Sequence, residues 1–412
     1  MPTPKAFLQE PSRSLPVCGD YDVIVVGGGI AGVAAAVAAA RTRARVCLLE
    51  RYCNLGGLAT IGNVIVYLPL CDGRGHQLCG GLAEELLRLS VAGLDRPRPE
   101  VCVLGVPEVW NRPASYEERA KERFATGFNP VHLMLRMEEL LRKNQVKIMY
   151  DTRFCDVVKE RKSITAVIIE NKDGRSALRC RAVVDASGDA DVCAAAGERT
   201  VSLRTNVPCG WFYSVDDGTF RLHEFSSPFK SDGSRHPTVK HQYSGVKAQD
   251  VTAQMLESRQ MIARELTRLS ADGQHDIWPA CIPTYPCFRM TRRLAAATTL
   301  CPEDDHRWFE DTVGMTGDWR KAGPVFCIPL SCLAGVKTGN LLVAGRCLSS
   351  TGDTWDVTRV IPTCAVSGEA AGVAAAMLSL DGLSSTRDID LYLLQRTLTR
   401  RRVIIDKALL KA

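Results

Sequence analysis

The alternation of hydrophobic and polar residues predicts an α/β fold that starts close to the beginning of the chain. Residues 21–26 form a run rich in valine and isoleucine, which is typical of a central strand buried on both faces. A glycine-rich turn follows at residues 27–32, and the alanine-rich stretch up to residue 40 has a high helix propensity. A second hydrophobic strand occupies residues 45–50. This order predicts a βαβ unit.

Later hydrophobic segments extend this unit into a larger sheet. We expect helices at 81–90 and 131–143, and strands at 146–150, 154–159, 164–171 and 179–185. The pattern of a strand followed by glycine returns at residues 340–345, and an alanine-rich helix follows from Pro362 to Leu378. Proline suits the first helical position because its missing N–H group has no partner there. The C-terminal part is therefore predicted to complete a Rossmann-like domain with a parallel central sheet.

Residues 201–325 differ in character from the segments on either side. They contain five of the seven histidines and one long amphipathic helix around residues 251–269, but no strand that runs into a glycine turn. We interpret this block as an inserted α+β lobe for the substrate. The predicted organisation is an N-terminal extension (1–20), the first part of the Rossmann-like domain (21–200), the substrate lobe (201–325) and the return of the first domain (326–412).

The charge of the chain argues against a nucleic-acid partner. The 52 basic and 46 acidic residues give a formal net charge of +6. The two signs are mixed along the chain, without the basic block that a nucleic-acid surface requires. Arg400, Arg401 and Arg402 form the densest cluster, which we expect to be solvated on a terminal helix or strand.

Neither a metal site nor a membrane segment is expected. The 17 cysteines include no CxxC pair, so their spacing does not match zinc or iron–sulfur sites. The chain has no uninterrupted apolar run of about 18 residues, and residues 1–20 lack the apolar core of a secretory signal. These features predict a soluble cytoplasmic protein without a membrane partner.

The glycine turn matches a dinucleotide-binding motif. Gly27, Gly29 and Gly32 follow a strand and open a helix, and the acidic residue Glu50 ends the next strand, as the motif requires. Gly27 would permit the tight turn, Gly29 would let the backbone approach a pyrophosphate, and Gly32 would let the helix pack on the strand. The Glu50 carboxylate would accept hydrogen bonds from ribose hydroxyls. The alternative is an ordinary α/β turn without a ligand.

The residues after Glu50 favour FAD over NAD. Arg51 and the loop Asn54-Leu55-Gly56-Gly57-Leu58-Ala59-Thr60 follow directly. This stretch resembles the FAD-dependent oxidoreductases related to fumarate reductase flavoproteins and thiazole synthases. The resemblance implies that the loop backbone runs along the pyrophosphate and ribityl chain toward the flavin ring.

Three later segments are similar to the same family and occur in its order. They are residues 184–189, 341–347 and 359–364, so that the resemblance covers roughly residues 21–380. The resemblance implies that the helix starting at Pro362 directs its positive end at the N1 and C2 carbonyl region of the flavin. The cofactor residues predicted by the motif and the resemblance are Gly27, Gly29, Ile30, Ala31, Gly32, Glu50, Arg51, Gly56, Gly57, Leu58, Ala59, Thr60, Phe154, Ala186, Ser187, Gly188, Gly345, Arg346, Pro362 and Thr363.

The substrate is expected near residues 285–293, where members of the family carry an arginine-rich segment. Arginine binds carboxylates in a bidentate manner and stays charged, so the resemblance implies catalytic or binding roles for Arg289 and Arg292. Thr291 stands where the family has an acidic residue. The alternative is that Arg292 and Arg293 form structural ion pairs.

A flavin enzyme often needs a proton carrier beside the ring, and His275 is our candidate. Spacing does not distinguish it from His236, His241 or His306. No second dinucleotide motif follows, so NAD(P)H would have to enter the substrate cavity itself.

These inferences predict an FAD-dependent oxidoreductase that transfers a hydride between a small organic substrate and flavin N5. Two alternatives remain open: a non-redox or biosynthetic use of the dinucleotide, as in proteins similar to thiazole synthase, and a flavoprotein that acts on transfer RNA. The sequence leaves open the substrate, the direction of the reaction and the oligomeric state.

Overall fold

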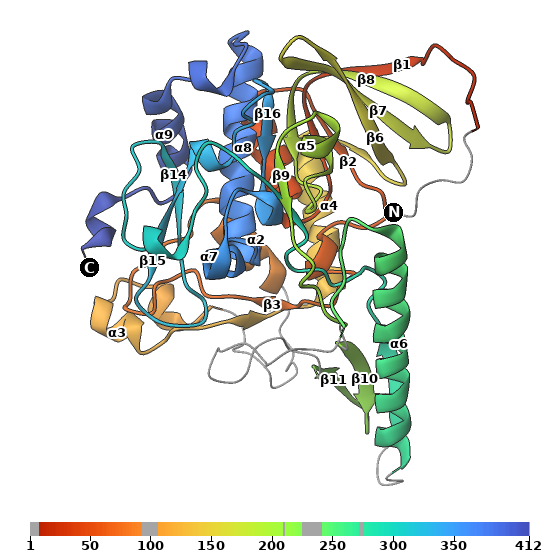
Figure 1. Cartoon of the computed structure of the whole chain (residues 1–412). Helices are drawn as coiled ribbons and strands as arrows, with labels where there is room; N and C mark the ends of the chain where they lie inside the picture. Colours follow the sequence, from red (N-terminus) through yellow and green to blue (C-terminus); the bar gives the residue numbers. More distant parts are fainter. Residues whose placement is uncertain (1–7, 93–105, 209–210, 225–240, 272–275, 412) are drawn as a thin grey trace.

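The computed structural model describes residues 8–92, 106–208, 211–224, 241–271 and 276–411 (Figure 1). A seven-stranded sheet forms its centre. Its order is β5 (Lys147–Met149), β2 (Val46–Leu49), β1 (Val17–Val26), β8 (Gly174–Asp185), β7 (Ser163–Asn171) and β6 (Arg153–Glu160), and β16 (Leu341–Val343) also pairs with β8.

The pairing of these strands is parallel around β1 and β8. Strand β1 pairs in parallel with β2 and β8, and the pairs β2 with β5 and β8 with β16 are parallel as well. The hairpin partners β6, β7 and β8 are antiparallel. The C-terminal part of the chain returns to this sheet through β16. The parallel pairs at the centre of the sheet confirm the predicted α/β fold with a parallel central sheet.

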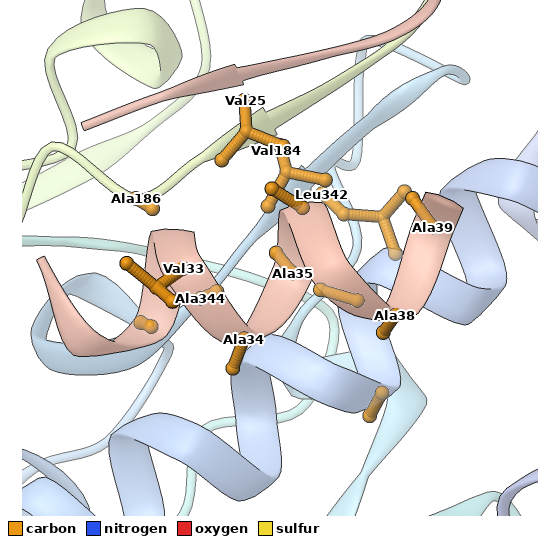
Figure 2. Close-up of a cluster of buried hydrophobic side chains, with 14 of the residues drawn as sticks. Val25, Val33, Ala34, Ala35, Ala38, Ala39, Val184, Ala186, Leu342 and Ala344 are labelled. Carbon is orange, nitrogen blue, oxygen red and sulfur yellow. The ribbon is translucent and has the colours of Figure 1, made fainter. Parts of the chain in front are cut away.

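Two apolar helices cover one face of the sheet. Helix α1 (Ile30–Arg41) lies between the sheet and α8 (Ile361–Leu380). Figure 2 shows the α1 side chains Val33 and Ala35 beside Val25, Val184 and Leu342 of the sheet strands. This layer is the principal hydrophobic core.

Glycines in α8 let it approach α1 at the level of the backbone. A Cβ atom on Gly368 would lie 2.3 Å from the Ala31 carbonyl oxygen, and one on Gly372 would lie 2.2 Å from the Ala35 carbonyl oxygen. Helix α8 is long and apolar enough to cross a membrane, but 89% of its apolar window is buried inside the protein. It is therefore the core helix of this fold.

A second region is built around one long helix. Strands β10 (Phe212–Asp216), β11 (Thr219–His223) and β12 (Ile277–Cys281) form a small sheet beside α6 (Ala248–Ala271). Figure 1 shows α6 and the β10–β11 hairpin extending away from the central sheet. Only Gln254, Ser258 and Ile262 of α6 are buried, as expected for a helix that packs along one narrow stripe.

The remaining elements connect these two regions and cover the sheet. They are β3 (Val66–Tyr67), α2 (Leu82–Val91), α3 (Tyr116–Ala120), β4 (Thr126–Gly127), α4 (Pro130–Lys143), α5 (Asp191–Ala195), β9 (Thr200–Ser202), β13 (Arg292–Leu294), β14 (Thr312–Gly317), β15 (Val325–Pro329), α7 (Gly352–Thr358) and α9 (Leu391–Arg400). The predicted boundary at residue 325 falls inside the β14–β15 hairpin, and the division into four segments stays a prediction.

The structure differs from the predicted elements mainly at their ends. Strand β1 begins at Val17, four residues earlier than predicted, because residues 17–20 pair with β8. These four residues are largely exposed, so they lack the hydrophobic run by which a buried strand is detected.

Candidate functional site

A cavity of about 270 Å³ lies where strands β1, β2 and β8 end. Most of the predicted cofactor residues line it, namely Gly27, Gly29, Ile30, Ala31, Glu50, Arg51, Gly56, Gly57, Leu58, Ala59, Phe154, Ala186, Ser187, Gly188 and Arg346. The cavity thus brings together segments that are more than 150 residues apart in the sequence. Ligands of doubly wound α/β folds bind at this carboxyl end of the strands.

The glycine loop has the geometry that a pyrophosphate site requires. Gly27 has a φ of +105°, and a Cβ atom there would lie 2.4 Å from the Ala186 carbonyl oxygen. A Cβ atom on Gly32 would lie 1.8 Å from the Gly27 carbonyl oxygen, so only glycine allows α1 to start here. A Cβ atom on Gly29 would meet nothing within 4 Å, because this residue faces the open cavity.

The N-terminus of α1 points at the same cavity. Gly29 precedes the helix, and no side chain caps this end. The first N–H groups of a helix have no partner within the helix, and together with the helix dipole they attract anions. The loop and the helix start therefore fit a phosphate group.

The Glu50 carboxylate holds the glycine loop and residue 52 through hydrogen bonds. One carboxylate oxygen accepts a hydrogen bond from the Gly28 N–H group at 2.7 Å, and the other accepts one from the Tyr52 N–H group at 2.9 Å. Burial raises the pKa of Glu50, and these backbone hydrogen bonds oppose the shift. Its carboxylate also lines the cavity, where the predicted ribose contact would occur.

Arg51 is a cation at the cavity wall without a carboxylate partner. Its guanidinium lies 5.0 Å from the ring centre of Tyr52 and 5.2 Å from that of Tyr285. It forms no hydrogen bond or ion pair with any residue that the structure describes. The charges of Glu50 and Asp189 act on it without direct contact, and a diphosphate group would be a direct anionic partner.

Arg346 joins three segments that are far apart in the sequence. Its Nε donates to the Gly188 carbonyl at 2.8 Å, its Nη1 to the Phe288 carbonyl at 2.6 Å, and its Nη2 to Asp189 at 2.8 Å. The side chain is buried. Arg346 therefore fixes Phe288 and the turn at Gly188 and Asp189 against the C-terminal segment, in addition to lining the cavity.

At the start of α8, the residues that line the cavity are the sequence neighbours of the predicted Pro362 and Thr363. Ile361 and Cys364 line it, because residues three apart lie on one face of a helix. Pro362 lies outside the lining, and the Thr363 hydroxyl is held instead by Thr316 at 2.8 Å and by the Val357 carbonyl at 3.1 Å. The start of α8 therefore meets the cavity, but through the neighbours of the two predicted residues.

Three further predicted cofactor residues have packing roles near the cavity. A Cβ atom on Gly345 would lie 2.7 Å from the Ala31 side chain, so this glycine lets the C-terminal segment pack on α1. Gly32 packs α1 on β1 as described above. The Thr60 hydroxyl donates to the Leu55 carbonyl at 2.5 Å and holds the loop closed.

The predicted substrate arginines lie behind the cavity wall. Arg292 donates to the Asp189 carbonyl at 2.7 Å and to the Asp191 carboxylate at 2.6 Å. The Arg289 N–H group donates to Asn206 at 2.7 Å, and neither arginine is among the residues that line the cavity. His275 and His236 lie outside the described residues. The catalytic roles of Arg289, Arg292 and His275 stay predictions.

Several lining residues carried no signal in the sequence. They are Tyr52, Thr152, Arg153 and Asp191, whereas Tyr285 and Arg359 lie in predicted segments but were not named as site residues. Asp191 is notable because its pKa is raised to about 6, first by burial and then by the nearby carboxylates of Asp189 and Asp185, while Arg292 opposes the shift. Its place two residues after the predicted turn was the only available hint.

No group of three or more histidine, cysteine, aspartate or glutamate side chains that could hold a metal ion occurs in the described part of the chain. The cavity lining combines the glycine loop with the cationic side chains of Arg51, Arg346 and Arg359.

Comparison with known proteins found one matching curated relative. A curated relative, the thioredoxin reductase of Ureaplasma parvum serovar 3, is 36% identical over 72 residues, which are 18% of this chain and 23% of the relative. The chain thus matches about a quarter of the length of that relative.

Two solved structures also resemble the model across most of their length. A geranylgeranyl bacteriochlorophyll reductase-like protein from Thermoplasma acidophilum matches with a TM-score of 0.43 at 12% identity, over 95% of this chain and 90% of the other. The p-nitrophenol 4-monooxygenase of Pseudomonas putida DLL-E4 matches with a TM-score of 0.44 at 14% identity, over 93% of this chain and 89% of the other.

The model of the FAD dependent oxidoreductase family matches residues 22–207 and 211–398, which is nearly the whole chain. This match confirms the resemblance inferred from the loop after Glu50, and it confirms FAD as the cofactor. The chain belongs to the family of FAD-dependent oxidoreductases.

Proposed function

We propose that this oxidoreductase transfers a hydride between a small organic substrate and N5 of the flavin. The observation that carries the proposal is the composition of the cavity. The loop residues Leu58 and Ala59 and the first turn of α8 line the same cavity as the phosphate-binding glycine loop. A dinucleotide held by its phosphates at Gly29 would therefore have its second end beside α8.

When bound, FAD supplies the capacity to accept or release a hydride. The protein supplies binding and electrostatics. The glycine loop and the start of α1 bind the diphosphate, and the Arg51 guanidinium neutralises it. The start of α8 favours the negative charge that collects on the ring during reduction.

We infer that Asp191 holds or releases the proton that accompanies the reaction. Its carboxyl lines the cavity and is bonded to Arg292, and its pKa of about 6 lies in the range in which a group can exchange protons near neutral pH. Glu50 is less suited, since both of its oxygens accept backbone hydrogen bonds.

Asp191→Asn tests this assignment. Below about pH 6 the carboxyl is protonated, so a step that needs the carboxylate slows in the wild type. We expect the rate constant of flavin reduction to lose this titration in the variant, while the FAD affinity stays within about threefold. An unchanged pH profile in Asp191→Asn would remove Asp191 from the mechanism.

We further propose that the partners are small molecules, not nucleic acids or membranes, and that the protein works in the cytoplasm. The mixed distribution of the 52 basic and 46 acidic residues supports this proposal. The burial of α8 inside the fold supports it as well.

A substrate screen tests the hydride transfer. FAD-loaded protein is mixed anaerobically with alcohols, amines, saturated carboxylic acids and NAD(P)H, and the dithionite-reduced protein is mixed with alkenes that carry a carbonyl group. We expect at least one compound to change the redox state of the flavin, with a primary isotope effect when the transferred hydrogen is deuterium. The proposal would be contradicted if dithionite reduces the flavin but none of the screened compounds reduces or reoxidises it.

A further inference from the structure

A second cavity lies on the other side of α8, away from the flavin site. Its volume is about 470 Å³, and its wall is formed by the end of α1, helix α2, the middle of α8 and the turn after α9. Helices α2 and α9 both contact α8 (Figure 1). The cavity is lined by four arginines and three glutamates, together with apolar side chains of α2.

A buried carboxyl group forms the floor of this second cavity. Glu369 of α8 is only 2% exposed, and one of its oxygens accepts a hydrogen bond from the Leu82 N–H group at 2.6 Å. A Cβ atom on Gly81 would lie 2.3 Å from this oxygen. Glycine at this position therefore lets the start of α2 approach Glu369 directly.

Two of the glutamates are paired with arginines, one between α1 and α2 and one within α2. Arg41 forms a bidentate pair with Glu85, with distances of 2.8 and 2.7 Å. Arg88 donates to Glu84 at 2.8 Å. These four charges cancel, so the remaining charges decide which ligand the cavity prefers.

The remaining charges have an excess of cations. Arg401 donates only to neutral oxygens, the Ala38 carbonyl and the Thr42 hydroxyl, both at 2.9 Å. The Arg402 guanidinium lines the cavity and forms no hydrogen bond or ion pair with a described side chain, although it lies close enough to Glu84 to interact with its charge. Because Glu84 and Glu85 are each paired with another arginine, Glu369 is the remaining carboxyl group opposite Arg401 and Arg402. Arg400 and Arg402 are exposed at the end of α9, as expected for a solvated cluster, and Arg401 and Arg402 also line this open cavity.

We propose that this second cavity binds a small molecule that carries one carboxylate and an apolar body. The carboxylate would lie between Arg402, Arg401 and the carboxyl group of Glu369, and the apolar body would contact α2. An arginine pair fits a carboxylate, and a protonated carboxyl group can donate a hydrogen bond to it. The apolar wall is formed by Leu82, Leu89 and Ala92.

Protonation of Glu369 makes the binding depend on pH. The pKa of Glu369 is raised to about 7, first by burial and also by the charge of Glu85, while the Leu82 N–H group, Arg401 and Arg41 oppose the shift. Below this pH the Glu369 carboxyl donates a hydrogen bond to the ligand. Above it the ionised group repels a carboxylate, so the affinity falls by about tenfold between pH 6 and pH 8.

Titration calorimetry with benzoate on the FAD-loaded full chain tests the proposal, with benzylamine and inorganic phosphate as comparison probes. We expect benzoate to bind without changing the flavin absorbance spectrum, and benzylamine not to bind. Absence of benzoate binding would overturn the proposal, and so would tighter binding of benzylamine or phosphate. A spectral change of the flavin on binding would place the benzoate in the flavin site and would overturn it as well.

Three variants locate the site. Arg402→Gln should weaken benzoate binding by about tenfold or more, since it removes a charge-assisted hydrogen bond. Arg400→Gln is the matched control, because Arg400 belongs to the same cluster but does not line the cavity, and its affinity should equal that of the wild type. Glu369→Gln keeps a hydrogen-bond donor at every pH, so its affinity should not change between pH 6 and pH 8. Equal weakening in Arg400→Gln and Arg402→Gln would overturn the proposal.

Discussion

Arg51 illustrates how a single side chain reveals the charge of a ligand. Its guanidinium packs on two aromatic rings, Tyr52 and Tyr285, and has no carboxylate partner in the described structure. A cation held in this way is costly to desolvate unless an anion compensates it. We propose that the diphosphate of FAD is that anion, because Arg51 lines the same cavity as the glycine loop.

Replacement of Arg51 should weaken the binding of FAD. We expect the dissociation constant of Arg51→Gln to rise by at least about tenfold, since a charge-assisted contact contributes roughly 1.5–3 kcal/mol. Arg51→Lys should be intermediate, and Arg179→Gln, on the exposed side of β8, should match the wild type. Fluorescence titration of the FAD-free protein measures the constants. Equal affinities of wild type and Arg51→Gln would show that the guanidinium does not contact the cofactor.

Glu369 should make the stability of the protein depend on pH. Its pKa rises from the ordinary value of 4.5 to about 7 on folding, mainly through burial. Between these values the unfolded chain is ionised while the folded chain keeps the proton. The contribution to stability is therefore complete below about pH 4.5 and is lost as the pH rises toward 7, by about 1.4 kcal/mol per pH unit.

Glu369→Gln removes this titration. The free energy of unfolding, measured in urea at pH 5 and pH 7, should fall less with pH in the variant than in the wild type. The hydrogen bond from Leu82 can be kept by the amide oxygen, so the variant should still fold. If the free energies of unfolding of wild type and variant differ by the same amount at pH 5 and pH 7, the raised pKa of Glu369 is contradicted.

At the scale of elements, the glycine loop and α8 approach the same cavity from different parts of the chain. The loop between β1 and α1 supplies backbone N–H groups, and α8 supplies the positive end of a helix that starts at Ile361. Helices α1 and α8 also pack on each other, where Gly368 and Gly372 of α8 meet the backbone of α1. The same packing that forms the core therefore aligns the two ends of the cofactor site.

Two glycines of one loop should respond differently to the same substitution. In Gly32→Ala the new Cβ atom would lie 1.8 Å from a backbone oxygen, so α1 must move and we expect a loss of several kcal/mol of stability. In Gly29→Ala the Cβ atom would enter open space, so we expect near-normal stability but weaker FAD binding. Thermal unfolding without FAD and FAD titration separate the two effects. A destabilised Gly29→Ala with normal FAD affinity would contradict the assigned roles.

The start of α8 should influence the reduction potential. Cys364 lies in its first turn and lines the cavity, so an ionised Cys364→Asp would place a negative charge near the flavin. We expect a potential lower by a few tens of millivolts at pH 8, with Cys364→Ala close to the wild type as the control. Spectroelectrochemical titration gives the values, and equal potentials of the two variants would place the flavin ring away from this turn.

At the scale of the whole molecule, local sequence patterns predicted those structural features that depend on residues close together in the chain. The buried run at 21–26, the three glycines and Glu50 all act within one βαβ unit, and the structure has that unit. The loop after Glu50 was sufficient to indicate FAD, and the family match confirms it.

Contacts between distant segments could not be predicted from local patterns. Arg346 bonds to Gly188 and Phe288, which lie 158 and 58 residues away, and no spacing rule encodes such a meeting. The lining of the cavity by Cys364, with Thr363 turned away, depends on the rotation of α8 against the body, which its packing on α1 determines. The pKa of Asp191 is raised first by burial and then by the carboxylates of Asp189 and Asp185, and both causes arise only after folding.

The most direct test of the account is the absorbance spectrum of the purified protein after saturation with FAD and removal of free cofactor. The account predicts a yellow protein with one flavin per chain, whose visible bands bleach on anaerobic reduction and return on oxidation. A correctly folded but colourless protein that retains no FAD would contradict it.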